Sequence, residues 1–217
     1  MSDIRFDGKV AIVTGAGGGL GRCHALELAR RGAKVVINDL GASMDGSGGN
    51  SAAAEAVVKE IEAMGGEAMA NGSSVADEAG VKKMIDDTMA RFGQIDILIA
   101  NAGILRDKSF SKMTQADIDL VIDVHLRGSF MPIHAAWDIM KAQNYGRIVV
   151  TTSSTGLYGN FGQANYGAAK LGLVGMMNTL KIEGAKNNIK INAVCPVAAT
   201  RMTEGLMPEA VLAQLKP

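Results

Sequence analysis

The sequence predicts an α/β fold in which a doubly wound parallel sheet is flanked by helices. Three observations predict it: short apolar runs of strand length, amphipathic segments of helix length between them, and polar or glycine residues where the apolar runs end. Strand and helix patterns alternate through the 217 residues without an interdomain linker. We therefore expect one domain spanning residues 1–217, with its ligand site beyond the carboxyl ends of the strands.

The first strand and the turn after it carry the strongest signal. Residues 9–14 form an apolar, β-branched run that leads directly into the glycine-rich segment 15–21, and a helix is expected over about 20–31. Glycine residues at such a turn let the backbone approach a pyrophosphate, which then lies on the helix N-terminus. A glycine cluster alone would also suit a flexible loop, but strand, glycines and helix together favour a dinucleotide site. Its candidate cofactor contacts are Gly15, Gly17, Gly19, Leu20 and Gly21.

The second strand ends in an acidic residue that bears on the choice of cofactor. Residues 34–39 read as a buried strand, and Asp39 follows Gly19 by twenty residues (39 − 19), about the distance at which a carboxylate meets the adenosine ribose hydroxyls. A carboxylate accepts hydrogen bonds from a 2′-hydroxyl and repels a 2′-phosphate. Neither Gly18 nor Leu40 supplies a basic clamp. We therefore predict a Rossmann-type fold that binds NAD rather than NADP.

The later elements follow the same alternation. A capping box at Thr114 and Asp117, with Asp in place of Glu, opens one long helix, and Pro132 inside that helix is expected to bend it. Helices are expected over 51–64, 77–92, 114–143 and 163–187, and strands over 67–70, 95–101, 147–152 and 190–194.

Tyr166 and Lys170 stand four residues apart (170 − 166) in an expected helix, so they share one face. A nearby ammonium favours phenolate and lowers a tyrosine pKa from about 10 towards neutral pH. Such a tyrosine suits acid/base chemistry between an alcohol and a carbonyl, and the hydroxyl of Ser153 can hydrogen-bond the carbonyl oxygen. A Tyr-x-x-x-Lys pair alone also fits an ordinary surface helix, but the dinucleotide signature favours the catalytic interpretation.

Composition excludes several other classes. The chain is 47% hydrophobic, and its 22 basic and 22 acidic residues leave no net charge. No basic block marks a nucleic-acid partner, and no apolar run predicts a membrane span or a signal peptide. Cys23 and Cys195 lack the spacing of a metal site, so we expect free thiols and no metal.

Taken together, these motifs resemble the short-chain dehydrogenase/reductase family over the whole chain. The motifs are the glycine segment 14–21, Asn101-Ala102-Gly103, Ser153, Tyr166-x-x-x-Lys170 and Pro196. The resemblance implies that Tyr166 is the acid/base and that Ser153 orients the carbonyl. It also implies that Lys170 lowers the tyrosine pKa and holds the nicotinamide ribose. Further cofactor contacts implied by the resemblance are Ser73, Ser74, Asn101, Ala102, Gly103, Tyr166, Lys170, Pro196, Val197 and Thr200.

Four longer stretches resemble one branch, the (3R)-hydroxyacyl-CoA dehydrogenase module of peroxisomal multifunctional enzymes and its stand-alone bacterial relatives. These stretches are 38–41, 101–107, 124–130 and 158–166. The resemblance implies NAD-linked interconversion of 3-hydroxyacyl and 3-ketoacyl thioesters. Tyr158 and Phe161 then become candidate substrate contacts, with loop packing as the alternative. Other interpretations are a 3-oxoacyl-carrier-protein reductase, a dehydrogenase of steroids or small secondary alcohols, and an NAD-binding pseudoenzyme that acts as a sensor.

Two departures from the family pattern bear on function. His125 stands where the family commonly places an asparagine of a proton relay, so it is either a relay residue or a packed histidine. Relatives also continue to a seventh strand, which is apparently missing here, so we expect either a fragment or a sheet edge covered by a partner chain. The resemblance implies a homodimer or homotetramer. It also implies a cytoplasmic location in a bacterium, or a peroxisomal one within a eukaryotic multifunctional enzyme.

Overall fold

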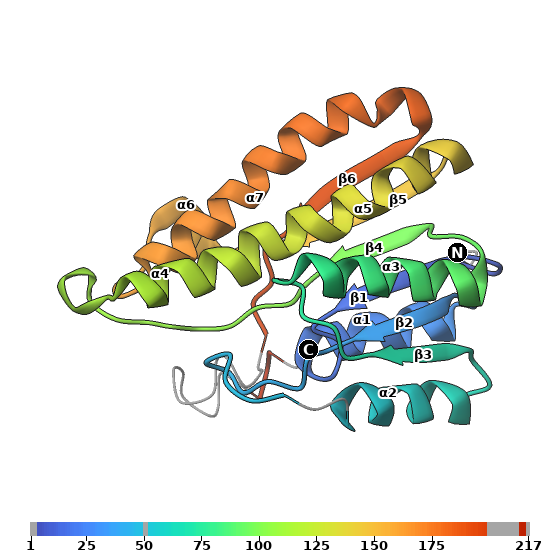
Figure 1. Cartoon of the computed structure of the whole chain (residues 1–217), viewed down its shortest axis with the longest axis horizontal. Coiled ribbons are helices and arrows are strands. Elements are labelled where there is room, and N and C mark those ends of the chain that lie inside the picture. Colours follow the sequence, from blue (N-terminus) through green and yellow to red (C-terminus); the bar gives the residue numbers. More distant parts are fainter. Residues whose placement is uncertain (1–3, 50–51, 199–212, 216–217) are drawn as a thin grey trace.

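The computed structural model describes residues 4–49, 52–198 and 213–215. At its centre lies a parallel sheet with the strand order β3-β2-β1-β4-β5-β6, which Figure 1 shows from β3 at the bottom to β6 at the top. The chain therefore starts mid-sheet, proceeds outwards to β3, and returns to β4 before proceeding to β6. This order confirms the predicted doubly wound α/β fold. The strands are β1 (Val10–Thr14), β2 (Lys34–Asn38), β3 (Ala68–Asn71), β4 (Ile97–Ala100), β5 (Gly146–Thr151) and β6 (Ile189–Val194).

Helices pack on both faces of this sheet and enclose two apolar layers. One layer joins α3, α5 and α7 to strand residues such as Ile12 and Leu98. The other joins α1 and α2 to the alternate strand residues, such as Ala11 and Val13. Strands covered on both faces are apolar throughout, which is why their runs stand out in the sequence. The α-helices are α1 (Gly19–Arg30), α2 (Ala52–Ala63), α3 (Glu78–Phe92), α4 (Gln115–Ile122), α5 (Gly128–Gln143), α6 (Ser154–Tyr158) and α7 (Ala164–Glu183).

The predicted continuous helix over 114–143 is wrong in its middle. A capping box at Thr114 opens α4 as predicted, but the π-helical segment η2 (Asp123–Arg127) separates α4 from α5. Pro132 lies within α5, so the irregularity precedes the proline. The proline has no N–H to give to the turn before it, which favours a wider turn upstream. The hydroxyl of Ser129 donates to the carbonyl of His125 at 2.7 Å and stabilises that turn.

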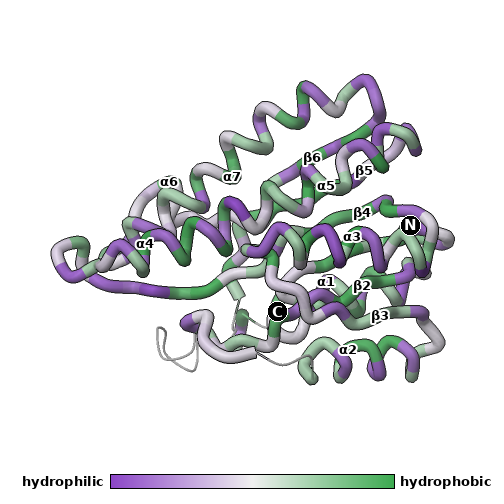
Figure 2. Tube along the Cα trace, in the orientation of Figure 1, coloured by the Kyte–Doolittle hydropathy of each residue, from purple (hydrophilic) through white to green (hydrophobic). Residues whose placement is uncertain are grey.

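Other boundaries differ from prediction by a few residues. The predicted helix over 163–187 ends as α-helix at Glu183 and continues as the 3₁₀ turn η3 (Ala185–Asn187). The short helix α6 and the 3₁₀ turn η1 (Phe110–Lys112) were not predicted. Figure 2 shows the alternation of hydrophilic and hydrophobic residues along α5 and α7. Among the described residues, no helix is both long enough and apolar enough to cross a bilayer.

Candidate functional site

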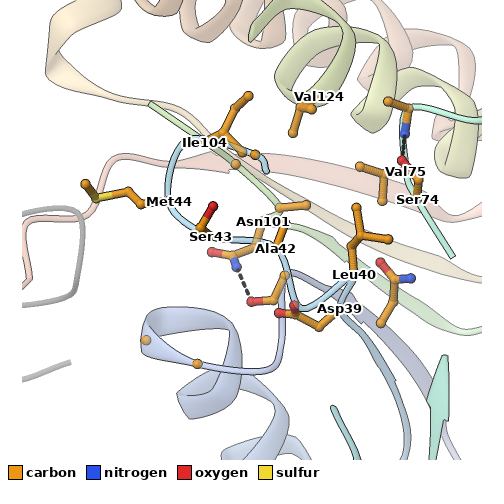
Figure 3. Close-up of a pocket in the computed structure, with 18 of the residues that line it drawn as sticks. Asp39, Leu40, Ala42, Ser43, Met44, Ser74, Val75, Asn101, Ile104 and Val124 are labelled. Atoms are coloured by element: carbon orange, nitrogen blue, oxygen red, sulfur yellow. Dashed lines mark hydrogen bonds between the residues drawn. The ribbon is translucent and has the colours of Figure 1, made fainter. Parts of the chain in front are cut away.

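A cavity opens beyond the carboxyl ends of β1, β2 and β4, where the direction of winding reverses (Figure 3). Ligands of doubly wound sheets bind at this switch point. The structure brings most of the predicted cofactor residues into the cavity wall. Those lining it are Gly15, Gly19, Leu20, Asp39, Ser73, Ser74, Asn101, Ala102 and Gly103.

Two glycine residues of the motif, Gly17 and Gly21, are not among the residues that line the cavity. A Cβ on Gly21 would lie 2.1 Å from the carbonyl oxygen of Gly15, and one on Gly17 would lie 2.8 Å from the Asp39 carboxylate. Gly15 has a φ of +64°, and a Cβ there would lie 2.8 Å from the Cα of Ala102. The glycines therefore let the turn fold against its neighbours, which leaves the following helix N-terminus open to a pyrophosphate.

The carboxylate of Asp39 is fixed by two backbone donors. Its Oδ2 accepts from the N–H of Gly17 and its Oδ1 from the N–H of Gly41, each at 2.7 Å. An ionised carboxylate offers about four acceptor directions, so about two remain for ribose hydroxyls. The geometry therefore fits the adenosine ribose of a dinucleotide.

Asn101 joins the end of β4 to the glycine turn. Its side-chain Nδ2 donates to the carbonyls of Thr14 and Gly15 at 3.1 and 3.2 Å, and its own N–H donates to the Thr14 hydroxyl at 3.0 Å. These bonds hold the floor of the cavity at a set distance from the turn. Asn101 therefore has a structural role, because it fixes the end of β4 against the glycine turn.

The segment 40–46, which follows β2, forms one side of the cavity. Ala42, Ser43, Met44 and Gly46 line it. The carbonyl of Met44 accepts from the N–H of Leu105 at 2.9 Å, and Arg106 Nε donates to the carbonyl of Asp45 at 2.6 Å. Contacts between segments so far apart in the chain leave no pattern in the sequence. The sequence did not predict the apolar part of the wall, which consists of Val75, Ile104 and Val124 (Figure 3) together with Leu120.

Lys170 and Tyr166 lie on the same face of α7, as predicted. Lys170 is 3% exposed, and its Nζ donates to the carbonyl of Thr151 at 2.6 Å and lies 5.4 Å from the centroid of the Tyr166 ring. Burial lowers the pKa of Lys170 to about 7. The amine is therefore close to the phenol ring but only partly protonated at neutral pH.

The predicted lowering of the Tyr166 pKa is wrong for the protein without cofactor. Burial raises the pKa of Tyr166, and this effect outweighs a hydrogen bond from Ser153, which lowers it. Ser153 lies just past β5, where its Oγ accepts from the N–H of Thr155 at 3.2 Å. The lysine charge is visible in the sequence, whereas the desolvation of both groups becomes visible only in the fold.

His125 lies in the π-helical segment and is 1% exposed. Its ring meets that of Tyr166 edge to face, with centroids 5.1 Å apart and planes at 86°. Nε2 lies 2.8 Å from the carbonyl oxygen and 3.1 Å from the nitrogen of Ile104, while Nδ1 has no partner among the described residues. Burial lowers the pKa of His125 to about 3, so the imidazole is neutral. The packed and relay interpretations are therefore both compatible with its position.

This cavity is not lined by Ser153, Tyr166, Lys170 or His125, nor by the remaining predicted residues that the structure describes. Tyr158 and Phe161 are 86% and 87% exposed on α6 and the turn after it. Pro196 and Val197 follow β6, with Val197 exposed, and Thr200 lies outside the described residues. Within the described part of the chain, no group of three or more acidic, histidine or cysteine residues could hold a metal.

Known proteins match this chain along its length. A family model described as short chain dehydrogenase matches residues 9–210. Peroxisomal multifunctional enzyme type 2 of Mus musculus is 56% identical over 216 residues, which cover 100% of this chain and 29% of that protein. The structure of full-length peroxisomal multifunctional enzyme type 2 from Drosophila melanogaster has a TM-score of 0.79 at 47% identity, covering 99% of this chain and 34% of that one.

A further solved structure bears on the cofactor. A 7α-hydroxysteroid dehydrogenase complexed with NADH and 7-oxo glycochenodeoxycholic acid has a TM-score of 0.86 at 28% identity, covering 97% of this chain and 79% of that one. This likeness and the family match support a nicotinamide cofactor. The chain spans about a third of the length of the multifunctional enzymes it matches. On the family model and the identities, the chain belongs to the short chain dehydrogenase family, a family of oxidoreductases that act on CH–OH groups.

Proposed function

We propose that this chain is an NAD-dependent (3R)-hydroxyacyl-CoA dehydrogenase with Tyr166 as its acid/base. The observation that carries the proposal is the arrangement of Tyr166 beside buried Lys170, Ser153 and His125. Phenol, hydroxyl and amine are the groups that proton transfer at a secondary alcohol requires. The substrate class is supported by the resemblance of segments 101–107 and 158–166 to the hydroxyacyl-CoA branch.

Each side chain then has a distinct role. The cavity wall around Asp39 and the glycine turn would hold NAD, and its oxidised form would supply the acceptor for the hydride of the carbinol carbon. The Tyr166 oxygen takes the hydroxyl proton in oxidation and returns it in reduction, while Ser153 donates a hydrogen bond to the substrate oxygen. Lys170, held by the Thr151 carbonyl, lies near enough to the phenol ring for its ammonium form to favour phenolate.

His125 has one atom that suits proton transfer out of the site. Its Nδ1 is buried and has no partner among the described residues, and a buried polar atom of this kind calls for a partner such as water. The edge-to-face contact with Tyr166 places the imidazole against the acid/base. We include His125 in the proposed site as a proton relay residue.

Asp39 supports NAD over NADP in this proposal. Its two backbone bonds hold the carboxylate at the cavity, where a 2′-phosphate would meet a fixed negative charge. The residues of the described cavity wall include no lysine or arginine that could offset that charge.

Steady-state kinetics test the proposed function. The purified chain is assayed with (3R)-3-hydroxyacyl-CoA substrates of several lengths, their (3S) epimers, and both NAD and NADP. We expect turnover of the (3R) series with NAD, and Tyr166→Phe should reduce kcat by about 10²- to 10⁴-fold. Equal turnover of the epimers, or an unaffected Phe variant, contradicts the proposal. No turnover by either protein, together with NAD binding, favours the sensor alternative.

A further inference from the structure

A chain of hydrogen bonds connects Ser153 to the segment that follows β4. Its centre is the side chain of Gln163, which is 8% exposed. Gln163 Oε1 accepts from the hydroxyl of Thr155 at 3.0 Å and from Asn160 Nδ2 at 3.1 Å. Its Nε2 donates to Oδ2 of Asp107 at 2.7 Å. Three separate segments therefore meet on one buried amide.

Asp107 determines which way this amide faces. An ionised carboxylate can only accept hydrogen bonds, so the NH₂ group of Gln163 must face Asp107. The carbonyl oxygen then faces Thr155 and Asn160, which supply an O–H and an N–H donor. Donors and acceptors match at every bond, and the opposite orientation of the amide would break all three.

The chain of bonds continues to Ser153. The N–H of Thr155 donates to Ser153 Oγ at 3.2 Å and occupies an acceptor site of the serine. The serine O–H is the donor that lowers the pKa of Tyr166, and in the proposed reaction it would donate to the substrate oxygen instead. Gln163 is also the N-cap of α7 and stands three residues before Tyr166 (166 − 163). Its carbonyl accepts from the N–H of Gly167 at 2.8 Å. Gln163 thus contacts both Thr155, which is bonded to Ser153, and the first turn of α7, which carries Tyr166.

One backbone bond and two bonds of the Asn165 side chain hold the same junction on its other side. The N–H of Lys108 donates to the carbonyl of Gly162 at 2.9 Å. Buried Asn165 donates from Nδ2 to the carbonyl of Asp117 at 3.1 Å, and its Oδ1 accepts from the N–H of Tyr166 at 2.8 Å. Because these bonds hold the segments together without Gln163, its side chain sets orientation within a junction that persists without it.

We infer that Gln163, oriented by Asp107, is a positioning residue that holds Ser153 as a hydrogen-bond donor towards the substrate and aligns Tyr166 with it. This inference rests on the proposed function, since it concerns the geometry of that reaction. It assigns roles to Asp107, Gln163 and Thr155, none of which lines the dinucleotide cavity. A change at Gln163 should therefore alter kcat more than the KM for NAD.

A charge exchange between two positions tests the inference. Gln163→Glu brings two carboxylates together in place of the bond at 2.7 Å, and we expect kcat to fall by about 10- to 100-fold because the site is misaligned. Adding Asp107→Asn lets the new amide donate to the new carboxylate. The double variant should then recover kcat to within about 3-fold of Asp107→Asn alone, as coupled neighbours do.

Two further variants make the outcome decisive. Thr155→Val removes only the hydroxyl donor, and we expect kcat to fall by about 3-fold. This variant tests the inference even if Gln163→Glu fails to fold. Asp119→Asn changes the exposed pair in which Gln115 donates to Asp119 at 2.7 Å, and it should leave kcat unchanged.

The results separate this inference from the proposed function. Wild-type protein that turns over no (3R)-hydroxyacyl-CoA refutes the proposed function and the inference together. Active wild-type protein with a double variant no better than Gln163→Glu, or with Thr155→Val at full kcat, refutes the inference alone. Recovery in the double variant, with the KM for NAD constant throughout, supports it.

Discussion

The protonation of Tyr166 is decided by several groups around one phenol. Burial raises its pKa, a hydrogen bond from Ser153 lowers it, and the charges of Asp107 and Cys195 raise it. The other groups that face it are Lys170, which is only partly protonated at neutral pH, and His125, which is uncharged. A buried phenol with so little positive charge nearby keeps its proton.

We therefore expect Tyr166 of the cofactor-free protein to ionise only above pH 10.0, its ordinary value. Ultraviolet absorbance of phenolate, measured as wild type minus Tyr166→Phe across a pH titration, isolates this group from the other two tyrosine residues. A difference signal that appears at neutral pH would contradict the structure. It would favour the lowering by Lys170 that the sequence pattern suggested.

Replacing Asp39 should relax the choice between cofactors. Asp39→Asn keeps an oxygen that can accept from Gly17 or Gly41 but removes the negative charge. Opposed like charges cost several kcal/mol, so the NAD-to-NADP ratio of kcat/KM should fall by on the order of 100-fold. The measurement is initial rates with each cofactor. An unchanged ratio would show that the carboxylate does not face the 2′ position, and Asp87→Asn, in an exposed ion pair, serves as the control.

His125 should make the fold sensitive to mild acid. Its pKa is about 3 when folded against an ordinary 6.5, so the unfolded chain binds the proton and stability falls as pH drops below 6.5. Between pH 7 and pH 5 this residue should remove about 2 kcal/mol of unfolding free energy. In urea unfolding, the unfolding free energy of His125→Asn should fall between pH 7 and pH 5 by that much less than the wild-type value does.

His24 also has a lowered pKa, again because of burial, but it is common to both proteins and cancels in the comparison. If wild type and His125→Asn lose equal unfolding free energy between pH 7 and pH 5, water or a proton reaches the imidazole in the folded state.

Single residues also show how far sequence reasoning can reach. Asp39 and Asn101 directly follow apolar strands and Ser153 lies two residues past one, so their positions at one edge of the sheet could be predicted. Gln163 and Asp107 were not singled out as a pair. Their meeting depends on the fold bringing positions 56 residues apart together. The spacing of residues in the sequence does not indicate such a contact, whereas the residues beside a strand end do indicate where the strand ends.

At the scale of elements, the π-helical segment depends on a glycine in the neighbouring loop. A Cβ at position 103 would lie 2.5 Å from Cε1 of His125, so Gly103→Ala must displace the imidazole. We expect a loss of about 1–3 kcal/mol in unfolding free energy, the range for overpacked cores, together with a fall in kcat. Thermal unfolding and steady-state kinetics measure the two effects.

A matched glycine and a second-site change check the cause. Gly175 lies inside α7, and a methyl group added there would have open space for 4 Å around it. Gly175→Ala should therefore stabilise the protein by up to about 1 kcal/mol through helix propensity. Adding His125→Ala to Gly103→Ala should remove the clash and recover part of the stability. A harmless Gly103→Ala would mean that the loop after β4 gives way more easily than the imidazole does.

The same segment marks the limit of element prediction from sequence. Residues 114–143 carry a helix pattern throughout, and the start at Thr114 was confirmed because its capping box is a local motif. The π-helical turn widens the helix locally without altering the apolar pattern enough to be seen. Two contacts accompany it: the local bond from Ser129 to the carbonyl of His125, and the tertiary approach of Gly128 to Val75 in the turn before α3.

At the scale of the whole molecule, strand register assembles the site. Thr14 pairs with Asn38, Asn38 with Asn71, and Ala100 with Val150, so these strands end almost level. The residues just beyond them therefore share one edge, which is how a chain of 217 residues brings position 15 to position 102. The alternating pattern predicted this topology, because βαβ units have few ways to connect.

A shared sheet also implies that the two apolar layers unfold together. Ile61, on α2, is fully buried in one layer, whereas Trp137, the only tryptophan, packs against the other. Ile61→Ala should cost about 2–5 kcal/mol as a core cavity. Because neighbouring residues of β1 point into opposite layers, tryptophan fluorescence and far-ultraviolet circular dichroism should shift to the same lower urea midpoint. Ile182→Ala, at a side chain 73% exposed, should change stability by no more than about 0.5 kcal/mol. A fluorescence midpoint that stays in place while the dichroism midpoint falls would mean that α1 and α2 unfold separately from the layer that supports Tyr166.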